Sequence, residues 1–376
     1  MSDLIPFMKP RLDGKRFEKH SIPLEMFRDL AVLEEMVIEV AKWRFRKQHP
    51  ERSRAPRGFA DGISIDLTGV DEGSAIPLIA LLAANSGLFP HSNLEYFEQA
   101  RDSIVAAVSA AENDEPITDK LPEEFLPYFD RLGRSLRDGE AFEFAPENTA
   151  RPARLTKSTR RKLLLASPTV EEVTDEVTLR GSIPGIQQEK KTFDLHVLNG
   201  PTVSGVIPEF HRKEILEAVT GYENGVRVLL KGVGRFNRNS RLVSLDSVED
   251  INILDPLDVP ARLADLKSLK DGWLDGKGLA PVIVGLDWFA KTFEANFPDD
   301  LPLPFVYPTA EGGIQLEWSL DGQELSLEVD LNLHSGIWHS LNLQTQQDES
   351  KVITLEGEGD WKQLSMEIRR LAGGQQ

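Results

Sequence analysis

The chain of 376 residues contains no cysteine. Disulfides, thiolate nucleophiles and every cysteine-ligated zinc or iron–sulfur site are therefore excluded, and the composition fits a reducing compartment. Histidine is scarce as well, and none of the seven has the spacing of a known metal motif. His334 and His339 are separated by an odd number of positions in a predicted strand, so their side chains would point to opposite faces. We predict no metal site and no cofactor.

Long apolar runs and targeting segments are also missing. The longest apolar run, residues 76–84, is too short to cross a bilayer. Residues 1–20 lack the apolar core of a signal peptide. We therefore expect a soluble, cytoplasmic protein with no membrane partner.

Common catalytic motifs are absent too. The sequence has no G-x-x-x-x-G-K-[ST] loop, no G-x-G-x-x-G, no G-x-S-x-G elbow and no H-E-x-x-H. Asp175 followed by Glu189-Lys190-Lys191 loosely resembles the D…E-x-K core of metal-dependent nucleases, whose carboxylates hold Mg²⁺. The E-x-K residues fall on a predicted hairpin tip, where such a site would be too exposed, so a solvated turn is the favoured interpretation. An enzyme with a dispersed site remains an alternative.

What the chain has in excess is negative charge, and most of that excess lies in its last third. The net charge is −18, from 43 basic and 61 acidic side chains. Residues 1–168 carry 24 basic and 27 acidic side chains, residues 169–255 carry 10 and 14, and residues 256–376 carry 9 and 20. The last segment would repel phosphate backbones, so its charge favours a basic partner protein.

Apolar periodicity predicts an α+β protein with three domains. Residues 1–168 form a mixed α/β N-terminal domain, residues 169–255 a small β-barrel, and residues 256–376 an acidic helix–β-meander–helix domain. In the first domain we expect helices over about 23–48, 93–108, 122–137 and 156–166, and strands at 63–67 and 75–84. Asn93 is expected to cap the second helix.

The middle segment carries its apolar runs in the order strand, strand, strand, helix, strand, strand. That order is expected of an OB-like barrel, which binds oligonucleotides or oligosaccharides across its face and loops. An SH3-like barrel, or a plain meander with an inserted helix, explains the same run. These alternatives stay open.

The last segment predicts a helix that buries Phe289 and Phe293, followed by three strands and a final helix. The strands at 314–320, 325–331 and 337–343 alternate apolar and polar residues, which is typical of a sheet with one buried face.

Four phrases resemble an uncharacterised bacterial protein family. They are ISIDLTGVDEGSAIP at 63–77, GRSLRDGE at 133–140, LKDGWLDGKGLAP at 269–281 and YPTAEGGIQLEWS at 307–319. The resemblance implies a bacterial cytoplasmic protein and supplies no catalytic residues. By analogy, families of this kind often lie near toxin–antitoxin or phage-defence genes.

Two predicted barrel loops supply candidate nucleic-acid contacts. Basic side chains there would neutralise phosphates, and neighbouring aromatic rings would stack on bases of single-stranded or duplex nucleic acid. The candidates are Lys190, Lys191, Phe193, Arg235, Phe236, Arg238 and Arg241. Two basic runs, 43–57 and 151–162, would either extend this track or neutralise the acidic third domain. The acidic balance of the whole chain favours the second interpretation.

A candidate protein-binding patch lies in the last segment. Trp338 is predicted on the strand face opposite His339 and Leu341, hence exposed, and exposed tryptophan is enriched at interface hot spots. Glu317, Glu328 and Asp330 complete the patch. The favoured function is a non-catalytic adaptor or regulator that binds a partner protein, as an antitoxin-like or defence-complex subunit. The alternative is a nucleic-acid-binding protein.

Overall fold

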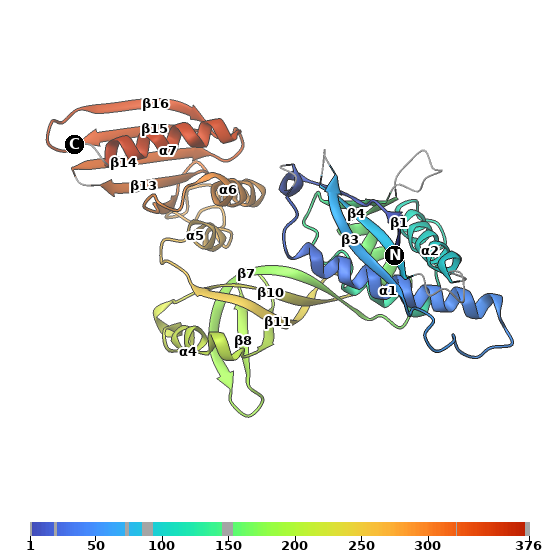
Figure 1. Cartoon of the computed structure of the whole chain (residues 1–376). Helices are drawn as coiled ribbons and strands as arrows, with labels where there is room; N and C mark the ends of the chain where they lie inside the picture. The colour runs from blue at the N-terminus through green and yellow to red at the C-terminus, as the bar shows by residue number, and fades with distance from the viewer. Residues whose placement is uncertain are drawn as a thin grey trace. The chain divides into compact units, whose positions relative to one another are not determined.

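The computed structural model describes residues 2–18, 21–71, 75–84, 93–144, 153–320 and 322–372 (Figure 1). The protein is a mixed α+β structure with several separate sheets, as predicted. It divides into two compact units, Met1–Val177 with Gly232–Glu249, and Thr178–Lys231 with Asp250–Gln376. The division into three domains stays a prediction. In the described ranges, no helix combines the length and apolar character that spanning a membrane requires.

Helices α1 (Met26–Gln48) and α2 (Leu94–Glu112) supply much of the first unit's core. The predicted apolar face of α2, including Phe97 and Ile104, is fully buried. Asn93 precedes α2, but its side-chain amide donates to the carbonyl of Phe59 and does not cap the helix, so that prediction was wrong. Thr156 caps the short helix α3 (Lys157–Leu165), accepting from the backbone of Thr159.

Two three-stranded sheets complete the first unit. One has the order β1-β4-β3, from β1 (Ser2–Met8), β4 (Ile76–Ala84) and β3 (Ile63–Asp71). The other has the order β2-β5-β6, from β2 (Arg11–Asp13), β5 (Ala141–Phe144) and β6 (Ala153–Leu155).

The helix expected over 122–137 is wrong, since the structure has a 3₁₀ segment, η2 (Glu123–Asp130), followed by turns. Pro127 inside the segment cannot donate a backbone hydrogen bond, and Gly133 adopts a positive φ of 80°. Shorter 3₁₀ segments are η1 (Lys15–Phe17), η3 (Glu209–His211) and η4 (Tyr222–Asn224).

The middle sheet has the predicted element order and is curled (Figure 1). Its strands are β7 (Glu172–Gln187), β8 (Thr192–Val197), β9 (Thr202–Val206), β10 (Val228–Asn237) and β11 (Leu242–Ile253), with α4 (Arg212–Thr220) after β9. Within the sheet they are ordered β11-β10-β7-β8-β9. The boundary between the compact units passes within β7, β10 and β11.

The C-terminal part of the second unit is an antiparallel meander with helices packed on it. The helices are α5 (Val259–Leu266), α6 (Ile283–Asn296) and α7 (Glu358–Ala372). The strands are β12 (Phe305–Pro308), β13 (Ile314–Leu320), β14 (Gln323–Asp330), β15 (Ser335–Asn342) and β16 (Asp348–Thr354), neighbours in that order. The three predicted strands correspond to β13, β14 and β15, and β12 and β16 extend the sheet on either side.

Candidate protein-binding surface

The sheet β12–β16 has one covered and one open face. Strand alternation sends Leu316, Trp318, Leu327 and Trp338 to the covered face, where they pack in one core with residues of α6 and α7. Phe289 of α6 and Trp361 of α7 are in ring contact there, with centroids 5.7 Å apart. The opposite face of the five strands has no helix packed on it among the described residues.

Trp338 lies in the core, so its predicted exposure is wrong. The side chain is 0% exposed, and its ring centroid lies 6.0 Å from that of Trp318. Trp338 is paired with Leu327 across the ladder, whereas its neighbour Ile337 is paired with Glu328 on the open face and is 51% exposed. In β15 the alternation was predicted correctly, but its buried and exposed faces were assigned in reverse. The apolar centre of the open face is therefore Ile337.

The three predicted carboxylates do lie on the open face. Glu317 is paired with Ser326, and Glu328 with Ile337. Glu317 accepts a 2.6 Å hydrogen bond from the amide of Gln315. Asp330 accepts from two backbone N–H groups of the turn between β14 and β15, at 2.8 and 3.0 Å, which leaves its other oxygen open to a ligand.

No basic residue on the strands balances these carboxylates. Residues 301–350 contain neither lysine nor arginine. Lys351 of β16 is paired with Trp338 and so lies toward the covered face, where its ammonium is 3.5 Å from Glu367 of α7. The open face therefore presents unneutralised negative charge.

Exposed apolar side chains lie among the carboxylates. Phe305 and Tyr307 of β12 are 48% and 45% exposed, with stacked rings 6.5 Å apart. At one end of the face, the turns after β12 and β14 border a hollow of about 310 Å³ that is lined in part by Glu328, Asp330 and Ile337. Acidic and apolar groups are thus interleaved across one continuous surface.

The candidate nucleic-acid residues are not gathered in the same way. Lys190 and Lys191 are exposed at the turn between β7 and β8. Phe193 is 0% exposed in the core of the middle sheet, so it is wrong as a base-stacking residue, because a strand that alternates Phe193 with Leu195 turns both inward. These residues belong to the second compact unit, and the loop of Arg235 to Arg241 belongs to the first.

Two arginines of that loop serve the first unit's own structure. Arg235 forms an ion pair with Asp246 and lies 3.7 Å from Glu172. Arg238 donates to the carbonyls of Val170 at 2.6 Å and Leu165 at 2.9 Å, which ties the loop to the end of α3. Phe236 is half-buried. Only the guanidinium of Arg241 has no partner among the described residues.

The basic run 151–162 is neutralised inside the first unit, apart from Arg151, which lies outside the described residues. Arg154 pairs with Asp13 at 2.9 Å, and Lys162 with Asp114 at 2.7 Å. Arg161 donates to the carbonyls of residues 237 and 238. The partners are acids and carbonyls of the first unit itself, so these contacts do not bear out the predicted neutralisation of the acidic third domain.

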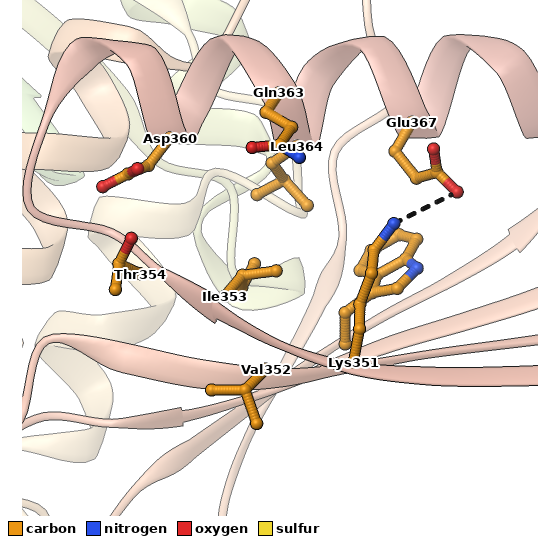
Figure 2. Close-up of a pocket in the computed structure, with 9 residues that line it drawn as sticks. Lys351, Val352, Ile353, Thr354, Asp360, Gln363, Leu364 and Glu367 are labelled. Atoms are coloured by element: carbon orange, nitrogen blue, oxygen red, sulfur yellow. Dashed lines mark ion pairs between the residues drawn. The ribbon is translucent and has the colours of Figure 1, made fainter.

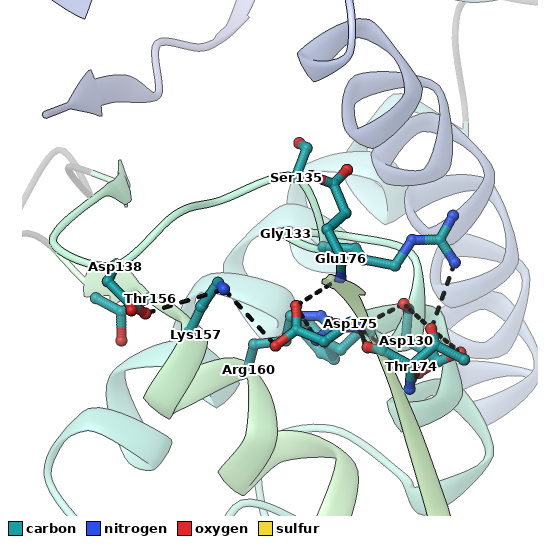
Figure 3. Close-up of polar contacts among 12 residues, drawn as sticks. Asp130, Gly133, Ser135, Asp138, Thr156, Lys157, Arg160, Thr174, Asp175 and Glu176 are labelled. Carbon is teal, nitrogen blue, oxygen red and sulfur yellow. Dashed lines mark hydrogen bonds and ion pairs between the residues drawn. The ribbon is translucent and has the colours of Figure 1, made fainter. Parts of the chain in front are cut away.

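Arg160 forms the centre of a buried polar cluster in the first unit (Figure 3). Its side chain is 1% exposed and donates to the carbonyls of Phe129, Asp130 and Thr174 at 2.5–2.8 Å. Its guanidinium lies 3.6 Å from the carboxylate of Asp130 and 3.9 Å from that of Asp175. Burial lowers the pKa of Arg160, and the neighbouring carboxylates oppose that effect.

Two carboxyls of this region are held in surroundings that disfavour their charge. Asp29 is 2% exposed and accepts hydrogen bonds from Ser135 and from the backbone of Gly133, yet burial raises its pKa. Burial likewise raises the pKa of Asp175, against the nearby Lys157 and Arg160. Asp175 is thus a partner of basic groups, and in the described ranges no three His, Asp or Glu side chains are arranged to hold a metal ion.

Sequence reasoning missed both the Arg160 cluster and the role of Ile337. The signal for Arg160 would have been its position within the apolar pattern of α3, next to Leu163 and Leu164, which are also buried. Comparisons with protein-family models, curated proteins and solved structures gave no match for this chain.

Proposed function

We propose that this protein is a non-catalytic adaptor whose C-terminal sheet binds a basic partner protein on its open face. The observation that carries the proposal is the segment 301–350, which builds most of that face and contains no lysine or arginine. Complementary charge steers association and selects against acidic partners. We propose that it acts in the cytoplasm, as a subunit of an antitoxin-like or defence complex.

The geometry fits a partner segment with basic and apolar side chains. Lysine and arginine combine an apolar stem with a cationic head. The hollow beside Ile337 offers an apolar wall to the stem, while Glu328 and Asp330 offer carboxylates to the head. Phe305 and Tyr307, on the edge strand β12, would accept apolar or cationic side chains on their rings.

The test places a photo-crosslinking amino acid at Ile337 in the full chain, expressed in its native host. We expect a discrete crosslinked protein whose sequence has an excess of lysine and arginine. Met366 is 61% exposed on α7, so the same crosslinker there is the matched control and should not yield that product. An acidic or neutral product, or identical products from both positions, would contradict the proposal.

A charge-reversal pair sharpens the test. The double variant Glu317→Lys and Glu328→Lys should abolish the Ile337 crosslink without changing thermal stability. The control Asp299→Lys and Glu356→Lys makes the same change in net charge at exposed positions away from the face, and it should retain the crosslink. Equal loss in both variants would show that only the overall charge matters.

Nucleic-acid binding through an OB-like barrel is the second candidate. It is supported by the strand order β11-β10-β7-β8-β9 with α4 between β9 and β10, and by basic side chains that have no partner among the described residues, Lys190 and Lys191 in the second unit and Arg241 in the first. Fluorescence anisotropy with labelled single-stranded and duplex DNA and RNA tests it. Binding that weakens with salt and is lost in the triple alanine variant of those residues would establish it. Absence of binding at low salt would exclude it.

A further inference from the structure

Strand β16 is an open edge of the C-terminal sheet. It is seven residues long, contains no proline, and among the described residues pairs with β15 alone. The opposite edge strand, β12, is four residues long and ends in Pro308. Short strands and prolines are ways in which proteins block strand addition at an edge. β16 lacks both.

The outward-facing backbone groups of β16 follow from its register. Asn342 donates to the carbonyl of Gln347, and Leu355 donates to that of His334, so both pairs are hydrogen-bonded. Hydrogen-bonded and non-hydrogen-bonded pairs alternate along an antiparallel ladder. Lys351 and Ile353 therefore bond toward β15. Ser350, Val352 and Thr354 direct their N–H and C=O groups to the free edge.

A groove of about 220 Å³ runs beside this edge, between β16 and α7 (Figure 2). Ile353 and Leu364 give it an apolar lining, and Gln363, Thr354 and Asp360 supply polar groups. The ion pair between Lys351 and Glu367 closes one end, as the dashed line in Figure 2 marks.

A buried donor at the groove has no acceptor. Trp338 lines the groove, and its indole Nε1–H is buried without a hydrogen-bond partner among the described residues. Leaving such a donor unpaired costs about 1–3 kcal/mol. The Lys351 side chain lies on the same face as its cross-strand neighbour Trp338. A shift of the Lys351–Glu367 pair would give a ligand's acceptor access to the indole.

We infer that β16 and the groove form a second binding site, which takes an extended peptide segment of a partner protein. The peptide adds as a sixth strand, exchanging backbone hydrogen bonds with Ser350, Val352 and Thr354. One of its side chains enters the groove, with an apolar body against Ile353 and Leu364 and an acceptor at its tip for Trp338. This site uses the edge of the sheet and does not require the proposed basic partner on the open face, although it shares one lining residue, Val352, with the hollow there.

The test uses a random-peptide phage library panned against the full-length protein, followed by titration of a selected synthetic peptide. Val352→Pro removes one outward N–H that peptide binding requires, while a proline whose missing N–H faces solvent is tolerated on an edge strand. We expect affinity to fall by at least about tenfold in Val352→Pro. The control Val352→Thr keeps the N–H and should stay within about twofold.

Amide hydrogen exchange gives a second, independent readout. Peptide binding should protect Ser350, Val352 and Thr354, while Lys351 and Ile353, which already bond to β15, should change little. Gln363→Trp fills the groove without touching the edge and should also weaken binding, which keeps the test decisive if the proline variant does not fold.

Three outcomes would overturn the inference: a library that yields no binder, binders that tolerate both Val352→Pro and Gln363→Trp, or equal protection of the five amides from Ser350 to Thr354. None of them bears on the open-face proposal, whose variants, Glu317→Lys and Glu328→Lys, should leave peptide affinity unchanged.

Discussion

The two units use charge in opposite ways. In the first unit, Arg160 is buried among carboxylates and carbonyls of its own chain, so its charge serves folding. In the second, Glu317 and Glu328 lie on an open sheet face, and the one lysine of its strands, Lys351, lies toward the covered face. Charged residues therefore indicate a binding surface only where the fold has not already paired them. The basic run 151–162 of the first unit, although dense in the sequence, is therefore the weaker candidate.

The largest expected effect comes from removing the centre of the buried cluster. Arg160→Met keeps most of the side-chain volume but removes the guanidinium beside Asp130, leaves Asp175 with Lys157 alone, and takes the Arg160 donors away from three carbonyls. Breaking a buried ionic cluster in this way costs about 3–5 kcal/mol. Urea unfolding followed by circular dichroism, which reports both units, measures the loss.

The matched control for Arg160→Met is Lys162→Ala on the same helix. Lys162 pairs with Asp114 at the surface, with side chains 40% and 78% exposed, so its loss should stay within about 0.5 kcal/mol. Equal losses in the free energy of unfolding for Arg160→Met and Lys162→Ala would show that the buried charges around Arg160 contribute no more to stability than an ordinary surface ion pair.

A similarly large effect distinguishes the two faces of the C-terminal sheet. Trp338→Ala opens a cavity in the core and should cost about 3–5 kcal/mol, whereas Ile337→Ala on the open face should cost under about 1 kcal/mol. Tryptophan fluorescence is suited to this measurement, because five of the six tryptophans lie in residues 256–376. Destabilisation by Ile337→Ala as large as that by Trp338→Ala would contradict the face assignment.

The alternating pattern of the sequence was enough to predict β13, β14 and β15 and the buried faces of β13 and β14, but not the buried face of β15. Ile337 and Leu341 on one side compete in apolar character with Trp338 on the other. Which of these two faces is buried depends on where α6 and α7 pack, and the local sequence pattern of a strand does not show this. The same reversal affected the candidate site, where the carboxylates were placed correctly and their apolar neighbour was not.

The buried polar cluster was beyond sequence reasoning for a different reason. Asp29, Asp130 and Asp175 come from separate elements, and only tertiary packing brings them around Arg160. Arginine is almost never fully buried without such partners, so its position among apolar residues of α3 was weak evidence by itself. Charge counts along the chain were correct and still did not identify which charges are free.

A smaller effect is expected at the loop after β10. Arg238→Ala removes the donors that tie this loop to the carbonyls of Leu165 and Val170, and should cost about 1–2 kcal/mol. Arg241→Ala, which removes a guanidinium without partners in the described chain, should stay within about 0.5 kcal/mol. Thermal unfolding of the two variants measures the difference. Equal stability would indicate that the Arg238 contacts are not maintained in solution.

The smallest effect concerns the pH dependence of the first unit. Burial raises the pKa of Asp29 in the folded protein, so the folded state binds this proton more tightly than the unfolded state does. The stabilisation is complete below the unfolded value of about 3.9 and is lost as pH rises through the folded pKa. Asp29→Asn has no titrating carboxyl at this position and therefore lacks this pH-dependent contribution to stability. Its melting temperature relative to wild type should therefore increase as pH is raised from about 4 to about 7.

Ser135→Ala gives the converse change at the same carboxyl. The Ser135 hydroxyl donates to Asp29 and lowers its pKa against the effect of burial, so removing it should raise the pKa further. This variant should lose stability with rising pH more steeply than wild type, while Asp29→Asn loses it less steeply. The half-buried carboxyls Asp175 and Glu176 are common to all three proteins; the charge of Asp29 also raises the pKa of Glu176, so Asp29→Asn lessens that shift and acts in the same direction as its own effect. Parallel curves of stability against pH for the three proteins would show that Asp29 has the same pKa in the folded and the unfolded state. The contrast between charges paired inside the first unit and charges exposed on the open face would then depend on Arg160 alone.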